Sequence, residues 1–163
     1  MSRKIDLGEL VSEPWILPPP ERFCSLLVVV TAARAEDLRA AMEAANMQFL
    51  KAFNTPDPAG FLPLYTADAV LLFADAPPIR GPEAITRFWE SRIRAGARAH
   101  TFELIETGAD GKYAYQLSRA GVQLIRDSGE RTPISGYTVR VFERQSDGGW
   151  KAKIHMFNRQ DVP

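Results

Sequence analysis

The stretch that decides the fold is residues 133–158, which read PISGYTVRVFERQSDGGWKAKIHMFN. Apolar and polar residues alternate along both halves of this stretch, and Asp147-Gly148-Gly149 separates the halves. Alternation with a period of two is typical of a half-buried β-strand, and Asp-Gly-Gly favours a tight hairpin turn. We therefore predict two antiparallel strands, over residues 133–144 and 149–158.

The period of two extends backwards from this hairpin to Arg98. It predicts three further strands, over residues 99–107, 112–119 and 121–127. Asp110-Gly111 and Asp127-Ser128-Gly129 are suited to the turns between them. Because consecutive hairpins pair neighbouring strands in opposite directions, the sheet is expected to be mostly antiparallel.

Helical spacing precedes the strands. Residues 36–54 are predicted to form a helix whose buried face carries Leu38, Met42, Ala45, Phe49, Ala52 and Phe53. A short helix over 58–65 follows, with Asp57 as its N-cap and a distortion at Pro63. After a brief strand at 69–73 and a non-helical loop at 75–81, a third helix runs from Pro82 to about Gly96. The predicted class is α+β, with three helices packed on a strongly curved, mostly antiparallel sheet.

Composition excludes several functions. The 163 residues carry 20 Lys plus Arg and 20 Asp plus Glu, and this zero net charge argues against a nucleic-acid partner. No apolar run is long enough for a membrane-spanning helix. A single cysteine, Cys24, cannot form an intrachain disulfide, and with only two histidines it leaves little for a metal site. We predict no metal and no cofactor.

Residues 1–35 differ from the rest and are interpreted as an extension, with the domain at 36–163. An uncharged run from Phe23 to Ala33, followed by Ala33-Arg34-Ala35, matches an export signal cleaved after Ala35. The acidic residues before this run do not fit such a signal. The alternative is a cytoplasmic protein in which Leu26–Val30 adds an extra strand to the domain.

Part of this extension has a resemblance of its own. Residues 10–20, LVSEPWILPPP, resemble a short piece of the effector-binding domain of LysR-type regulators. The piece is too short to fold alone, and it implies a gene-fusion remnant or a misplaced start.

The domain itself carries ordered motifs that resemble a larger family. These are Tyr65-Thr-Ala-Asp68-Ala69, Pro77-Pro78-x-x-Gly81, Ala84-Ile85-x-x-Phe88-Trp89, Gly136-Tyr137, Arg140-Val-Phe-Glu-Arg-Gln145 and Asp147-Gly-x-Trp150-Lys151. Over residues 36–160 their order resembles the NTF2-like superfamily, in its SnoaL-like and DUF4440-type members, which have a cystatin-like α+β fold. The resemblance implies a cone-shaped sheet around the first helix, a pocket at the open end, and a homodimer.

The resemblance also provides a catalytic test. Ketosteroid-isomerase chemistry needs a carboxylate base and an acid pair that stabilises the oxyanion. Matched through Tyr65–Ala69, the base falls at Phe73, the tyrosine acid near Phe49, and the second acid on the strand of Thr138, so all three groups are absent. Many DUF4440-type relatives also carry an aspartate at the position of His155. A function that depends on this aspartate cannot be assigned to the present sequence.

The remaining candidates are weak as catalysts. His100, which shares a strand face with Phe102 and Leu104, and Asp75 in the proline loop are candidate bases. The alternation of Trp150, Ala152, Ile154 and Met156 indicates a core face, so His155 is expected on the outer face or at a dimer interface. Arg119 and Arg140 could bind a carboxylate or pair with a glutamate. The expected ligand-binding residues are Phe49, Phe73, Trp89, His100, Tyr115, Tyr137 and Asn158.

Three functions follow from these residues. The first is a domain that binds a small hydrophobic or amphipathic molecule in a mostly apolar pocket, with its reaction unknown. The second is a cofactor-free isomerase, lyase or cyclase that uses His100 or Asp75 with Tyr115 or Tyr137. The third is a dimerisation module without a ligand, whose outer sheet face includes Phe157 and Phe142. Arginines 80, 87, 92, 94 and 98 are interpreted as a solvated helix face, with anion binding as the alternative.

Overall fold

The computed structural model describes residues 21–55, 58–73 and 76–160, with side chains from residue 34 onward. The chain divides into two units between Arg34 and Ala35, and the unit from Ala35 on is described below. Helix α1 (Glu21–Asn54) crosses this boundary. The strand predicted at Leu26–Val30 is therefore wrong, since no proline or glycine interrupts the helix between Glu21 and Asn54. Among the described residues, no helix has the length and apolarity needed to cross a membrane.

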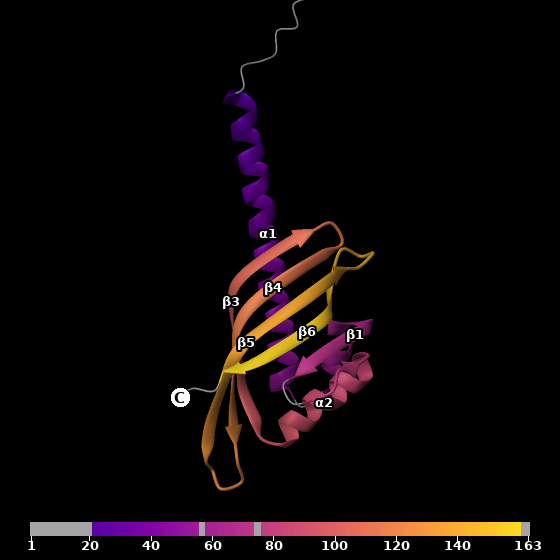
Figure 1. Cartoon of the computed structure of the whole chain (residues 1–163), viewed down its shortest axis with the longest axis vertical. Helices are drawn as coiled ribbons and strands as arrows, with labels where there is room; N and C mark the ends of the chain where they lie inside the picture. The colour runs from indigo at the N-terminus through magenta and orange to yellow at the C-terminus, as the bar shows by residue number, and fades with distance from the viewer. Residues whose placement is uncertain (1–20, 56–57, 74–75, 161–163) are drawn as a thin grey trace, which may run out of the picture. The chain divides into compact units, whose positions relative to one another are not determined.

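A single sheet of six strands forms the body of the domain (Figure 1). The strands are β1 (Tyr65–Phe73), β2 (Ile79–Arg80), β3 (Ala97–Asp110), β4 (Tyr113–Ile125), β5 (Arg131–Arg144) and β6 (Trp150–Gln160). Their order is β2-β1-β6-β5-β4-β3, and only β1 and β6 pair in parallel. The mixed α+β class and the mostly antiparallel sheet are confirmed.

Helix α1 ends at the predicted Asn54 but begins at Glu21 instead of residue 36, whereas the two later helices begin and end close to the predicted residues. The 3-10 helix η1 (Pro58–Leu64) contains Pro63, which accounts for its departure from α-helical geometry. Helix α2 (Pro82–Arg94) starts after Gly81 with a proline in its first turn. Gly96 ends the helical segment at φ 97°, where a Cβ atom would lie 2.0 Å from the carbonyl oxygen of Ile125. Only glycine fits this close approach. The N-cap predicted at Asp57 lies outside the described residues.

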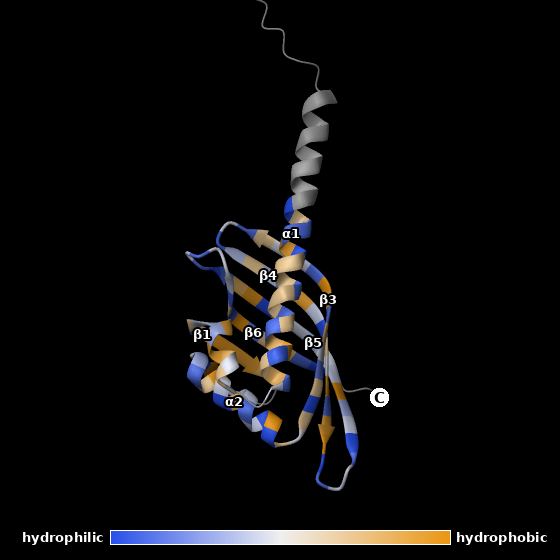
Figure 2. Cartoon of the chain, turned by 180° about the vertical axis from the view of Figure 1, so that it is seen from behind, coloured by the Kyte–Doolittle hydropathy of each residue, from blue (hydrophilic) through white to orange (hydrophobic). Residues whose placement is uncertain are grey.

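The core lies between the helices and the concave face of the sheet. Figure 2 shows α1 crossing this face, and Met42, Phe49 and Phe53 of α1 are buried there as the helical spacing predicts. Phe61 of η1 and Ile85 and Trp89 of α2 belong to the same cluster, together with buried residues of the sheet. The aromatic rings meet mostly edge to face, as in Phe49 and Trp89, whose centroids are 5.2 Å apart.

Strand β4 corrects one prediction. The period of two predicted two strands here, over residues 112–119 and 121–127. In the structure β4 pairs with β5 without interruption from Tyr113 to Ile125. Gly121 lies where Thr101 of β3 comes close, since a Cβ atom at Gly121 would lie 2.9 Å from the Thr101 hydroxyl oxygen. The glycine thus marks a close approach between strands rather than a turn.

Of the register shifts in the sheet, one in β3 and one in β6 adjoin the two histidines. In β3 the pairing shifts between Arg98 and Thr101, and Ala99 within this bulge has φ 52°. In β6, Ala152 pairs with Phe142 and Ile154 pairs with Val141, so Lys153 is an extra residue. A bulge reverses the alternation of the residues that follow it. As a result His155 is buried, whereas Ile154 and Met156 are exposed.

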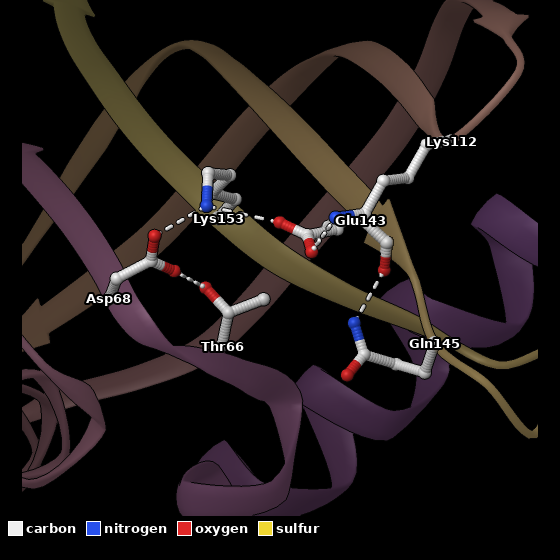
Figure 3. Close-up of polar contacts among 6 residues, drawn as sticks. All are labelled: Thr66, Asp68, Lys112, Glu143, Gln145 and Lys153. Atoms are coloured by element: carbon white, nitrogen blue, oxygen red, sulfur yellow. Dashed lines mark hydrogen bonds and ion pairs between the residues drawn. The ribbon is translucent and has the colours of Figure 1, made fainter.

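A small ionic network surrounds the extra residue Lys153 (Figure 3). Its ammonium group contacts Asp68 of β1 at 2.5 Å and Glu143 of β5 at 3.0 Å. Lys112 contacts the same Glu143 at 2.7 Å, and Thr66 donates to Asp68. These carboxylates raise the pKa of Lys153. The network joins β1, β5 and β6 at the bulge that turns His155 inward.

Candidate functional site

A cavity of about 170 Å³ opens between the concave face of the sheet and helix α2. Most of its wall is apolar, from Phe53, Phe73, Phe102, Val122, Ile134 and Phe157. The polar side chains on the wall are those of Arg92, His100, Thr138, His155 and Arg159. No aspartate or glutamate is among the lining residues that the structure describes. Such a cavity suits an apolar molecule with a few polar groups.

His155 is held by a buried chain of hydrogen bonds. Trp89 Nε1 donates to the Tyr65 hydroxyl oxygen at 3.0 Å, and that hydroxyl lies 2.9 Å from His155 Nδ1. Because the indole can only donate, the Tyr65 oxygen accepts from Trp89, and we assign the Tyr65 proton to His155 Nδ1 as the acceptor. The neutral ring therefore carries its own proton on Nε2, the nitrogen left for the cavity that His155 lines.

Burial keeps His155 uncharged. The side chain is 2% exposed, and desolvation, together with the charge of Arg140, holds its pKa well below the usual range. Burial also raises the pKa of the Tyr65 hydroxyl, so the chain from Trp89 to His155 stays neutral near pH 7. His155 therefore presents an uncharged N–H donor to the cavity rather than a cation.

His100 supplies the second imidazole. Its ring packs 4.6 Å from Phe102 and 5.0 Å from Phe53, measured between centroids. Its Nδ1 atom is buried and has no hydrogen-bond partner in the described part of the chain. Desolvation and the charge of Arg140 lower its pKa to about 4. At neutral pH His100 is therefore an uncharged imidazole with an unsatisfied nitrogen beside the cavity.

Arg140 lies behind this wall, on β5. It is 3% exposed, and its guanidinium contacts the Phe102 ring at 4.7 Å and the Phe142 ring at 5.2 Å. Its Nη2 donates to the oxygen of Gln116 at 2.7 Å and to that of Asn46, while Nε has no partner in the described chain. Both acceptors are neutral amides, and burial lowers the pKa of Arg140 to about 10. A buried arginine is ordinarily paired with a carboxylate.

The structure places the predicted ligand-binding residues in three environments. Phe73, Trp89 and His100 line the cavity. Phe49 is buried in the core, in ring contact with His100 at 5.3 Å. Tyr115, Tyr137 and Asn158 do not line the cavity. Asp75 lies outside the described residues.

The residues that miss the cavity do so because of strand parity. Tyr115 and Tyr137 alternate with inward-facing Gln116 and Thr138, and the Tyr115 hydroxyl donates to Glu106 on the exposed surface. Asn158 follows the β6 bulge and is exposed like Met156. Placing these three in the pocket was therefore wrong, as was placing His155 on the outer face.

Several site residues escaped the sequence analysis. Tyr65 stands out in the sequence only as part of a family motif. Asn46 lies on the apolar face of α1 and is not among the predicted site residues. Of the two arginines weighed as carboxylate ligands, Arg119 is exposed and pairs with Glu103 at 3.2 Å. Gln116, Ser118, Thr138 and Arg140 recur at every second position of neighbouring strands, which is the signal that could have revealed a polar inner face.

A family model for the SnoaL-like domain matches residues 47–152, and the chain belongs to this family. No curated protein matches the chain. Among solved structures, a ketosteroid isomerase-like protein from Erwinia carotovora atroseptica is 22% identical, with a TM-score of 0.67, and the match covers 78% of this chain and 98% of that one.

Two further solved structures share the fold. An NTF2-like protein with a cystatin-like fold from Novosphingobium aromaticivorans is 16% identical, with a TM-score of 0.69 over 83% of this chain and 90% of that one. An NTF2-like superfamily protein from Salmonella enterica is 13% identical, with a TM-score of 0.66 over 78% and 94%. The expected NTF2-like fold is confirmed.

Proposed function

We propose that this domain binds a small amphipathic molecule whose apolar body fills the cavity and whose oxygen accepts a hydrogen bond from His155 Nε2. The observation that carries the proposal is an apolar cavity of about 170 Å³ beside two uncharged imidazoles. An engineered apolar cavity of about 150 Å³ binds benzene. A ligand of one aromatic ring with a polar substituent therefore matches the available space.

The geometry favours binding over isomerisation. An isomerase needs a base near its working pH, and a pKa of about 4 makes the His100 imidazole a weak base. Tyr115 and Tyr137, the expected acids, belong to the outer face. The inner face of β5 carries Thr138 and Arg140 and no carboxylate among its described residues.

Acetophenone is expected to bind the full-length protein with a dissociation constant on the order of 0.1–1 mM, a typical affinity for a ligand of its size. Val122→Phe, which fills the cavity, should weaken binding at least about tenfold. Ile105→Phe, the same kind of change at an exposed site on β3, should leave it intact. Calorimetry and amide chemical shifts measure both effects.

Either of two results would contradict this proposal: no saturable binding of acetophenone or of its charged analogue benzoate at millimolar concentration, or equal affinities in the Val122→Phe and Ile105→Phe variants. The same samples in D₂O report on catalysis through the methyl protons of acetophenone. We expect these protons to exchange no faster than in buffer. Faster exchange that disappears in His100→Phe would instead favour the enzyme.

We also propose that two copies associate through the outer face of the sheet. The bulge at Lys153 turns Ile154 and Met156 outward, and they are 39% and 40% exposed. Tyr113 and Tyr115 add 43% and 41% exposed rings on β4. Phe142 and Phe157, which were expected on this face, belong to the inner side. An exposed apolar patch of this kind marks an interaction surface.

Sedimentation should detect a dimer at micromolar concentration. Met156→Lys places a charge in the patch and is expected to weaken association at least about tenfold. Arg126→Glu, a charge change at the β4–β5 turn, is the control and should leave the dimer intact. A wild-type monomer at micromolar concentration would refute the dimer.

A further inference from the structure

We propose that the cavity selects a hydrophobic monoanion, such as an aromatic carboxylate, with buried Arg140 as its countercharge. This inference rests on the proposed binding function and adds the charge of the ligand. Arg140 is 3% exposed, and its guanidinium has no carboxylate partner in the described part of the chain. Folding has already desolvated this cation, so its attraction for an anion is preorganised.

The surroundings of the cavity are consistently positive. Arg140 packs against Phe102, which lines the cavity, and its charge acts on both lining histidines. Arg92 also lines the cavity and lies over the Phe73 ring at 5.1 Å from its centroid. No described acidic side chain lines the wall to offset these charges.

The cavity also holds hydrogen-bond donors for an anion. His155 presents Nε2–H because Tyr65 occupies Nδ1 as the donor. The neutral His100 adds no competing negative charge to the cavity wall. Without Arg140, the cost of desolvating a carboxylate would favour a neutral ligand in this apolar space. When Arg140 is present, the carboxylate is attracted to its positive charge through surroundings of low dielectric constant, and a neutral ligand lacks this attraction.

Benzoate and benzamide differ in charge and have nearly the same shape, so they test the inference directly. In calorimetry on the full-length protein at low ionic strength, benzoate should bind at least about tenfold more tightly than benzamide. If benzamide binds as well as or better than benzoate, the charge inference is wrong while the binding function stands. If benzoate, benzamide and acetophenone all fail to bind, the binding function itself is wrong.

Gln116→Glu identifies the source of the preference. Because the Gln116 oxygen accepts from Arg140 at 2.7 Å, this nearly isosteric change gives Arg140 an internal counter-ion. The preference for benzoate should then fall about tenfold, and Arg140→Met should do the same. Arg119→Met, on the exposed side of β4, is the matched control and should keep the preference. A preference unchanged in a folded Gln116→Glu or Arg140→Met protein would overturn the role of Arg140.

Discussion

Acidification from about pH 7 to about pH 4.5 is expected to lower the free energy of unfolding by roughly 2.4 kcal/mol through His100 alone. The pKa of its imidazole is about 4 in the folded protein, against 6.5 for an ordinary histidine. Between these values the unfolded chain binds the proton and the folded protein does not. Stability is therefore fully present above about pH 6.5 and declines as the pH falls toward about 4.

His155 acts in the same direction, because its pKa is also held below the ordinary value. These are the only two histidines in the sequence, which makes the window from pH 7 to 4.5 informative. Asp68 and Glu143 have lowered pKa values, so their contributions are lost mainly at lower pH, as the carboxylates become protonated.

Urea denaturation at several pH values measures this effect, and His100→Phe is the diagnostic variant. Its ring can join Phe49, Phe53 and Phe102, which already surround His100 at centroid distances of 4.6–5.3 Å. We expect nearly wild-type stability at neutral pH and a pH dependence reduced by about half. A wild-type protein equally stable at pH 7 and pH 4.5 would mean that the histidines are hydrated and that the cavity wall is not as described.

The parts of the fold that follow from local chemistry could be predicted from sequence. Met42, Phe49 and Phe53 recur at helical spacing and are buried, and Gly81-Pro82 and Gly96 bound helix α2. Turn chemistry at Asp127-Ser128-Gly129 likewise marks the β4–β5 hairpin. Each signal lies within a few residues of the feature that it determines, and no tertiary information is needed to recognise it.

The candidate site was predicted less well because it depends on register. The alternation Trp150, Ala152, Ile154, Met156 looks like one face of a strand, but the extra residue at Lys153 moves Ile154 and Met156 to the other face. The contacts of Lys153 with Asp68 and Glu143 involve strands far apart in sequence. One inserted residue thus exchanges the environments of His155 and its neighbours.

The polar inner face was missed for a different reason. Gln116, Ser118 and Thr138 carry no sequence signal of burial, because polar residues usually face solvent. They are buried because they bond to one another, to Arg140 or to backbone, and Asn46 of α1 completes the set. Such a network satisfies its members only when all of them are in place, so no single position reveals it.

Asn46→Leu is expected to lower the free energy of unfolding by about 3 kcal/mol, since it leaves a buried guanidinium short of an acceptor. Asn46 Oδ1 accepts from Arg140 Nη2 and, at 2.9 Å, from Gln116 Nε2. Gln48→Leu is the matched control, because it makes a similar change at an exposed position of the same helix. That control should change stability by less than about 0.5 kcal/mol.

The double-mutant cycle with Arg140→Met separates the charge from the lost side-chain volume. Arg140→Met alone removes a buried cation whose partners are neutral, and its cost should be small, within about 1 kcal/mol of wild type. In the Arg140→Met background, Asn46→Leu no longer leaves a buried charge without its acceptor. The loss of unfolding free energy that it causes should then fall to about 1 kcal/mol, which corresponds to a coupling energy of roughly 2 kcal/mol. Additive changes, within about 0.5 kcal/mol, would show that Asn46 does not serve the charge of Arg140. A measured coupling would instead establish that Asn46 stabilises the charge that Arg140 holds behind the cavity wall.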